Sequence, residues 1–147
     1  MLDAQGNLYG TTAGGGTYDQ GMVFKLDTTG KETALYSFTG TAGDGASPQA
    51  GLVRDAQGNL YGTTVSGGDA SCDAPYGCGT VFKIDASGNE TVLYRFTGTG
   101  GDGEFPYAGL VQDGQGNLYG TTFNGGSASC SNGYGGVGCG IVFKLTP

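Results

Sequence analysis

The sequence contains no histidine and no tryptophan. Without histidine the commonest general base is missing, and so are the Ser-His and Cys-His nucleophile pairs. Basic residues are also scarce, because 6 Lys and Arg stand against 13 Asp and Glu, for a net charge of −7. Such a chain is poorly suited to the phosphates of nucleic acids or to an anionic membrane surface. We therefore expect no enzyme activity and no nucleic-acid partner.

Long apolar segments are missing as well. No run approaches the roughly 18 apolar residues of a membrane-spanning helix, so we expect no membrane insertion. Only 4 residues are proline, whereas 33 are glycine, and the glycines follow no Gly-X-Y period, which excludes collagen. Frequent Thr, Tyr, Phe and Val alongside this glycine are typical of short strands joined by tight turns.

Internal repetition dominates the chain. Residues 3–12 recur unchanged at 55–64 and with one substitution, Gly114 for alanine, at 113–122. The spacing from Phe24 to Asp55 and from Phe82 to Asp113 is 31 residues in both cases. The length variation therefore falls in one surface loop of the repeat. The other recurring blocks are 22–27, 80–85 and 141–145, then 32–39 and 90–97, and finally 50–53 and 108–111.

Each recurring block is predicted to be a strand, because it is short, rich in β-branched and aromatic residues, and bounded by Gly, Asn, Asp or Pro. Four strands in a unit of roughly 52 to 58 residues predict a four-stranded antiparallel meander, the blade of a β-propeller. We expect an all-β fold of about two and a half to three β-propeller-type blades, open or part of a larger ring. Within one repeat domain, 1–147, these are incomplete blade 1 at 1–40, blade 2 at 50–98 and incomplete blade 3 at 108–147. A β-solenoid is the main alternative.

Alternation along the last strand of the middle unit predicts which side chains share a face. Val92, Tyr94 and Phe96 are expected on one face of the sheet. Leu93 and Arg95 are expected on the other. The preceding strand, Val-Phe-Lys-Ile at 81–84, is apolar on both faces except at Lys83, which suits a sheet packed between two neighbours.

Aspartates recur at the hairpin turns. An Asp side chain can accept hydrogen bonds from turn amides, and the following Gly can adopt a positive φ. We therefore predict a structural, turn-capping role for these carboxylates. They are Asp27, Asp55, Asp85 and Asp113.

Four cysteines lie in the variable loop, as the pairs Cys72 with Cys78 and Cys130 with Cys139. Cysteines that arrive in pairs with an insertion indicate local disulfides. A four-cysteine metal site is the alternative, but neither spacing resembles a C-x2-C knuckle. Disulfides predict an oxidising compartment, such as the periplasm, the cell surface or the exterior.

Two further carboxylate sites are candidate cation ligands. Asp44 and Asp102 each lie between glycines, and Glu104 follows close behind Asp102. Oxygen ligands of this kind suit Ca2+. A plain turn is the competing interpretation, and no other cofactor is predicted.

Exposed aromatic residues are the candidate ligand-binding groups. The loop tyrosines Tyr76, Tyr107 and Tyr134 are candidates for stacking against a sugar. Asn89 begins an Asn-Glu-Thr triplet that fits the N-glycosylation pattern, within a tight turn.

The repeat resembles a known bacterial family. The blocks GNLYGTT at 58–64, GG at 67–68 and GTVFKI at 79–84 resemble the GloVer tandem repeat of bacterial choice-of-anchor surface proteins. More distantly, GLV at 109–111 and GNLY at 116–119 are similar to NHL-type propeller blades. The resemblance implies exported, surface-anchored, propeller-like proteins with no assigned reaction, although this chain has few repeats and no visible anchor.

The functional expectation is a non-enzymatic extracellular repeat protein with a binding or scaffolding role. Because the first and third units are incomplete, we expect it to associate with other copies of itself or with the missing blades of a longer chain, and carbohydrate is a further candidate partner. An alternative is a structural subunit that assembles into a ring or filament through open blade edges. A carbohydrate-active enzyme is the remote alternative.

Overall fold

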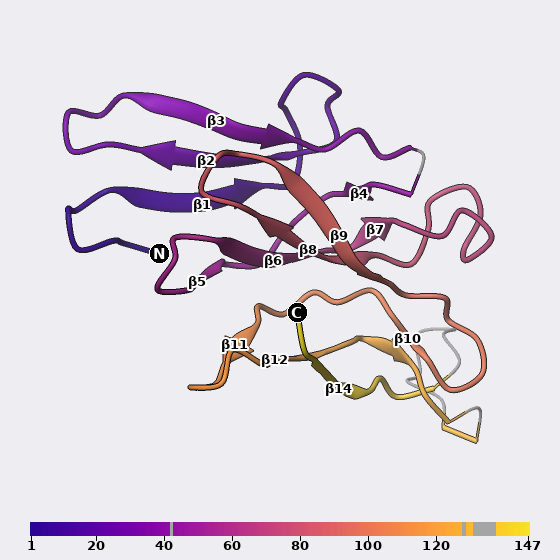
Figure 1. Cartoon of the computed structure of the whole chain (residues 1–147). Helices are drawn as coiled ribbons and strands as arrows, with labels where there is room; N and C mark the ends of the chain where they lie inside the picture. The colour runs from indigo at the N-terminus through magenta and orange to yellow at the C-terminus, as the bar shows by residue number, and fades with distance from the viewer. Residues whose placement is uncertain (42, 128, 131–137) are drawn as a thin grey trace.

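The computed structural model describes residues 1–41, 43–127, 129–130 and 138–147. These residues form short antiparallel strands in several small sheets, which confirms the all-β prediction. No helix in the described part of the chain is long and apolar enough to cross a membrane. Three main sheets lie one above another, in chain order (Figure 1).

Each main sheet corresponds to one copy of the repeat, and its strands pair in the order in which they follow along the chain. Sheet 1 holds β1 (Leu8–Thr12), β2 (Met22–Leu26) and β3 (Glu32–Ser37). Sheet 2 holds β5 (Val53–Arg54), β6 (Leu60–Thr64), β8 (Thr80–Ile84) and β9 (Glu90–Arg95). Sheet 3 holds β11 (Val111–Gln112), β12 (Leu118–Thr121) and β14 (Val142–Leu145). Sheet 2 is thus a complete four-stranded antiparallel meander.

Two short strand pairs link the sheets. They are β4 (Gly45–Ala46) with β7 (Ser66–Gly67), and β10 (Gly103–Glu104) with β13 (Asn124–Gly125). A single bridge between Leu2 and Leu8 places the start of the chain beside β1, where β5 lies beside β6 in sheet 2. The same local pattern therefore builds the same pairing in each unit.

A β-bulge changes the predicted alternation in β9. The register of β8 and β9 shifts between Val81 and Phe82, and β2 and β3 shift at the equivalent place. Leu93 consequently packs into the same core as Phe96, although strict alternation puts them on opposite faces. The prediction for Leu93 was wrong because a bulge adds one residue to the strand and resets the period-two pattern after it.

The glycine in the repeated Tyr-Gly-Thr block is required by packing. Gly62 pairs across the sheet with Phe82. A Cβ atom at Gly62 would lie 2.6 Å from Cζ of Phe82 and 2.8 Å from Cδ2 of Leu52. The phenylalanine ring therefore covers the glycine, and equivalent crowding occurs at Gly10 and Gly120.

Two hydrophobic cores lie between the three sheets. The first core joins Val23 and Phe38 of unit 1 to Phe82 of sheet 2, and the second joins Val81 and Phe96 of unit 2 to sheet 3. Sheet 2 contributes to both cores, and every residue of β6 is buried. Sheets 1 and 3 each have one covered face, as expected for the outer layers of a stack.

The two junctions also share a hydrogen bond. Thr11 Oγ1 donates to the carbonyl of Ala50 at 2.9 Å, and Thr63 Oγ1 donates to the carbonyl of Ala108 at 3.1 Å. A threonine of one unit thus fixes the Ala-Gly segment of the next. Successive repeats therefore pack through the same pair of faces.

The turn-capping prediction for the repeated aspartates is confirmed. Asp55 Oδ1 accepts hydrogen bonds from the amides of Gln57 and Asn59, and Asp55 Oδ2 accepts from Asn59 Nδ2 and the Tyr61 hydroxyl. In the equivalent turn of unit 3, hydrogen bonds led by that of the Asn117 side chain lower the pKa of Asp113 to about 2. Asp27 and Asp85 cap their turns through the same carboxylate-to-amide bonds.

Candidate functional site

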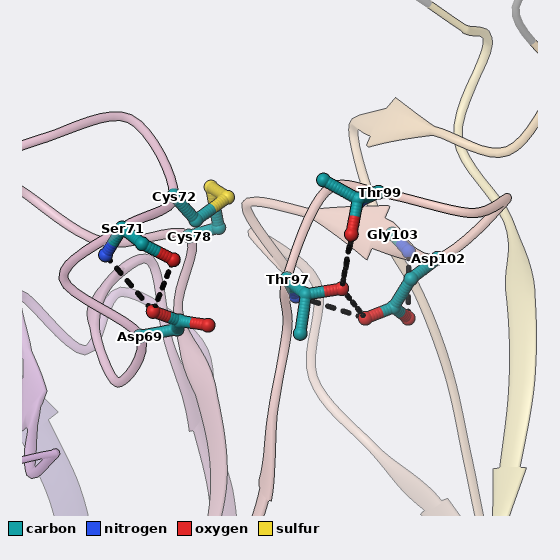
Figure 2. Close-up of a disulfide and its surroundings, with 8 residues drawn as sticks. All are labelled: Asp69, Ser71, Cys72, Cys78, Thr97, Thr99, Asp102 and Gly103. Carbon is teal, nitrogen blue, oxygen red and sulfur yellow. Dashed lines mark hydrogen bonds between the residues drawn. A yellow bond between two sulfur atoms is a disulfide. The ribbon is translucent and has the colours of Figure 1, made fainter.

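The Cys72–Cys78 disulfide anchors the variable loop of unit 2 (Figure 2). Its Cα atoms are 5.6 Å apart, an ordinary separation for a disulfide. Cys78 is fully buried and packs with Val81 and Phe96 in the second core. The second predicted disulfide, Cys130–Cys139, is also present. Both predicted pairings are confirmed.

Hydrogen bonds hold the disulfide loop in one conformation. Asp69 Oδ1 accepts from the amide of Ser71 at 2.9 Å and from its hydroxyl at 2.7 Å (Figure 2). The amide of Gly67 donates to the carbonyl of Tyr76 at 2.7 Å, which ties the far side of the loop to β7. The backbone at Tyr76 is therefore hydrogen-bonded to β7, while its side chain is 68 % exposed.

Tyr76 lies at the rim of a pocket of about 240 Å³ between units 1 and 2. The wall combines two ring-bearing side chains with hydroxyl and amide groups that can donate and accept hydrogen bonds. An exposed aromatic face beside such groups suits a polyhydroxylated ligand, whose apolar ring face and hydroxyls both find partners. The lining residues are Gln20, Thr39, Gly40, Thr41, Ala46, Ser47, Ser66, Pro75 and Tyr76.

The other two candidate tyrosines do not line this pocket. Tyr107 follows β10, at the junction of units 2 and 3, where it is 47 % exposed and makes an edge-to-face contact with Phe123. Tyr134 lies outside the described residues. The structure therefore assigns a pocket to Tyr76 among these predicted residues.

Two of the three candidate cation ligands, Asp44 and Asp102, are engaged as turn caps. Asp44 Oδ2 accepts from the amide and hydroxyl of Thr39, and Asp102 makes the same two bonds to Thr97 (Figure 2). Glu104 lies on β10, in register with Asn124. Within the described ranges, no three His, Cys, Asp or Glu side chains gather as a metal site would require.

The predicted glycosylation residue sits in a capped turn. Asn89 is exposed, and its side-chain amide donates to Asp85 Oδ2 at 2.9 Å. The backbone amide of Asn89 donates to the other oxygen of the same carboxylate. The Asn89 side chain thus helps to stabilise the hairpin between β8 and β9.

Comparison with protein families covers the full chain. Residues 1–147 match the model of the Gloeobacter/Verrucomicrobia repeat. This chain belongs to the Gloeobacter/Verrucomicrobia repeat family. No curated protein matches the chain significantly. The predicted repeat family is thereby confirmed.

One carboxyl group in this Gloeobacter/Verrucomicrobia repeat protein is poorly solvated. Glu90, at the start of β9, has a buried Oε1 atom with no hydrogen-bond partner among the described residues. Burial, and then the charge of Asp44, raise the pKa of Glu90 to about 7, although Arg95 opposes the shift. The folded protein therefore favours the protonated form of this side chain.

The substitution Glu90→Gln is expected to stabilise the protein above neutral pH. A carboxyl whose pKa is raised on folding retains its proton in the folded state between about pH 4.5 and 7, while the unfolded chain releases it. Stability of the wild-type protein should fall with rising pH over that interval and level off above it. The variant should lose this slope and gain about 1 kcal/mol at pH 8, a value discounted for solvent screening.

Urea unfolding of both proteins at half-unit steps from pH 5 to 8 measures this effect. The turn-capping aspartates with lowered pKa values, such as Asp3 at about 2, do not titrate in this range. Parallel stability curves for the two proteins would contradict the assignment to Glu90.

Several lining residues of the Tyr76 pocket escaped prediction from the sequence. Gln20 belongs to unit 1 and Ser66 to unit 2, so chain folding alone brings them together. A weak signal existed for Thr39, because the same Phe-Thr-Gly triplet recurs at Thr97. Recurrence identifies a structural role in each unit but cannot show that one copy borders a pocket.

Proposed function

We propose that this chain is a non-enzymatic extracellular repeat protein that binds carbohydrate in the Tyr76 pocket. The observation that supports the proposal is the exposed Tyr76 ring on a disulfide-anchored loop, beside the hydroxyl and amide groups of residues from units 1 and 2. A fixed loop loses little conformational entropy when a ligand binds, which favours affinity from a small pocket. The protein acts as a binding or scaffolding module.

The cysteines support the proposed location. Two disulfides suggest an oxidising compartment, because reducing conditions in the cytosol disfavour such bonds. Placement outside the cell or on its surface is part of the proposal. An extracellular module of this kind would meet the glycans of its own envelope or of its surroundings.

The use of the carboxylates supports a non-enzymatic role. Glycoside hydrolysis needs a pair of carboxyl groups free to face one bond. In this chain Asp55, Asp113 and Asp44 each accept several hydrogen bonds from their own turn or loop. These groups serve the fold, and ligand recognition is assigned to Tyr76 and its neutral polar neighbours.

For the architecture, we propose that the sheets are blades of a β-propeller. Two observations support this: successive units pack through equivalent faces, and the start of the chain and the first strands of sheets 2 and 3 border one hollow of about 480 Å³. The hollow is lined at Met1, at 52–54 and at 110–112. Innermost strands gather around such an axis in a propeller. An experimental structure showing parallel flat layers instead of rotated ones would contradict this arrangement.

The substitution Tyr76→Ala tests the carbohydrate site. Glycan-array binding followed by titration calorimetry should show a loss of affinity of at least about tenfold, because the stacking surface is gone. Tyr76→Phe should retain most of the affinity, since the ring remains. The control is Tyr18→Ala, at a tyrosine that is 57 % exposed but lies outside the pocket.

Two results of the binding experiment would contradict the proposed function. Equal binding by wild-type protein and Tyr76→Ala would remove the assignment of the site. Turnover of a bound polysaccharide would replace the binding role with an enzymatic one.

A further inference from the structure

The outer edge of β14 differs from its equivalents in the other two units. In sheets 1 and 2 the strand corresponding to β14 has a neighbour on both sides: β2 lies between β1 and β3, and β8 lies between β6 and β9. Among the described residues, β14 pairs with β12 alone. The peptide groups along its second edge are thus available to another strand.

A groove runs beside this edge. It measures about 330 Å³ and continues the second core, because Val81, Phe96 and Phe143 contribute to both. Its walls come from sheet 2 on one side and from β14 on the other. The lining residues are Val81, Tyr94, Phe96, Asp102, Ile141, Phe143, Lys144 and Leu145.

At the first junction a strand fills the corresponding space. There β9 pairs with β8, and the turn before β9 lies against unit 1, where a Cβ atom at Gly88 would be 3.7 Å from the carbonyl oxygen of Leu35. The charge of Glu90, on β9, also acts on Tyr36 of β3. The free edge of β14 is therefore equivalent to the edge of β8 that β9 occupies one unit earlier.

We propose that the outer edge of β14 and its groove bind an extended strand with the sequence pattern Glu-Thr-x-Leu-Tyr-x-Phe-Thr, presented by another repeat of this family. The pattern is that of 32–39 and 90–97. Main-chain hydrogen bonds to the edge supply affinity, as in other cases of strand addition. The groove receives the side chain opposite Phe143, which in β9 is Val92, opposite Phe82 of the first core. This inference is independent of the Tyr76 pocket.

The two internal examples define the register of the added strand. Val81 pairs with Tyr94, Phe82 with Val92 and Lys83 with Thr91, with a bulge after Val81. By this register, Val142 lies opposite the tyrosine of the added strand. Phe143 lies opposite the residue two positions before that tyrosine, and Lys144 lies opposite the threonine that follows the glutamate. The same bulge is expected between Val142 and Phe143.

The backbone just before β14 also resembles the backbone at the two internal examples. The amide of Phe38 donates to the carbonyl of Gly21, and the amide of Phe96 donates to the carbonyl of Gly79, at 3.0 Å in both cases. Gly140 is the equivalent glycine of unit 3, and its φ of 81° is close to the 93° of the other two. Its carbonyl is placed to accept from the phenylalanine amide of the added strand.

The exposure of β14 also differs from that of its equivalents. Val23 and Val81 are fully buried, each in a core that also holds the phenylalanine following the fourth strand of its unit. Val142, at the equivalent position, is 80 % exposed. Within this chain β3 and β9 are already paired with β2 and β8. If two copies exchanged one of these strands, an existing pair would have to break, so a separate repeat is the better source of the added strand.

A fluorescently labelled peptide with the sequence of 88–99 tests the proposal on the intact, disulfide-bonded chain. Fluorescence anisotropy should show saturable binding. Hydrogen exchange should slow at β14 and remain unchanged at β3, whose outer edge is also unpaired within the described chain. Absence of binding at about 1 mM peptide, or equal protection at both edges, would overturn the proposal.

Matched variants separate strand addition from adhesion to an apolar surface. A peptide with Thr91→Pro loses the amide donor that faces the neighbouring strand opposite Lys83, and it should bind at least about tenfold more weakly, as should a scrambled peptide. Val142→Asp in the protein should weaken binding to the same extent without affecting folding, because the side chain is exposed. Leu2→Asp, at a residue that is 66 % exposed in unit 1, should leave binding unchanged.

Association between copies is the remaining outcome. A dimer that forms without peptide and that the peptide cannot compete away would assign the edge to a second copy and overturn the proposal. A monomer that binds the peptide with the predicted protection pattern would support it.

Discussion

Replacing Phe82 with alanine is expected to lower the free energy of unfolding by about 3–5 kcal/mol. Phe82 is fully buried in the first core, stacks edge-to-face with Phe38 at 5.0 Å between ring centroids, and covers Gly62 in the neighbouring strand. Its removal leaves a cavity that the glycine cannot fill. Both the lost burial and the cavity contribute to the destabilisation.

The equivalent residue of unit 1 is the matched control. Phe24 covers Gly10 in the same way but remains partly exposed, because sheet 1 has one uncovered face. Phe24→Ala should therefore cost less than half as much as Phe82→Ala. Guanidinium unfolding followed by circular dichroism, with the disulfides intact, measures both. Equal losses would show that sheet 2 is not the inner layer of the stack.

Replacing Gly79 with alanine is expected to cost more than about 3 kcal/mol, for two combined reasons. Gly79 has a φ of +93°, which side chains rarely tolerate. A Cβ atom there would also collide with the carbonyl oxygen of Thr64 and lie 2.7 Å from Cδ of Pro106. The carbonyl of Gly79 accepts the amide of Phe96, so movement of this segment would disturb the second core.

Gly30→Ala isolates the conformational part of that cost. Gly30 has a similar φ of +84°, and a Cβ atom there would meet nothing within 4 Å. Its substitution should cost about 1 kcal/mol, from backbone strain alone. The difference between the two variants in thermal or denaturant unfolding gives the contribution of crowding. A similar loss at both positions would mean that crowding at Gly79 is relieved at no cost.

Short-range features of this protein could be predicted because each depends on neighbours in sequence. Asp55 caps its turn with groups no more than six residues away, and Cys72 pairs with Cys78 six residues on. Such contacts form whenever the local chain adopts its preferred turn. The repeat extended the prediction of capped turns to all three units and the prediction of a disulfide to units 2 and 3.

Features that join different units could not be predicted in this way. The rim residue Tyr76 was a candidate, but its pocket partner Gln20 lies more than fifty residues earlier and carries no distinguishing pattern. Leu93 was assigned to the wrong face because a bulge has no clear signature in one sequence. The buried oxygen of Glu90 arises from the approach of unit 1, and Glu32 at the same repeat position is exposed.

Sequence by itself determined the strands of the three main sheets, their order in each meander, the capped turns and the disulfide pairs, because period-two patterning and turn chemistry act locally. Tertiary structure alone decided what each face of those strands touches. Val23, Val81 and Val142 occupy the same repeat position, yet the first two are fully buried and the third is 80 % exposed. The difference arises because burial depends on which sheet lies alongside. Similar local sequences do not indicate which sheet will pack against them.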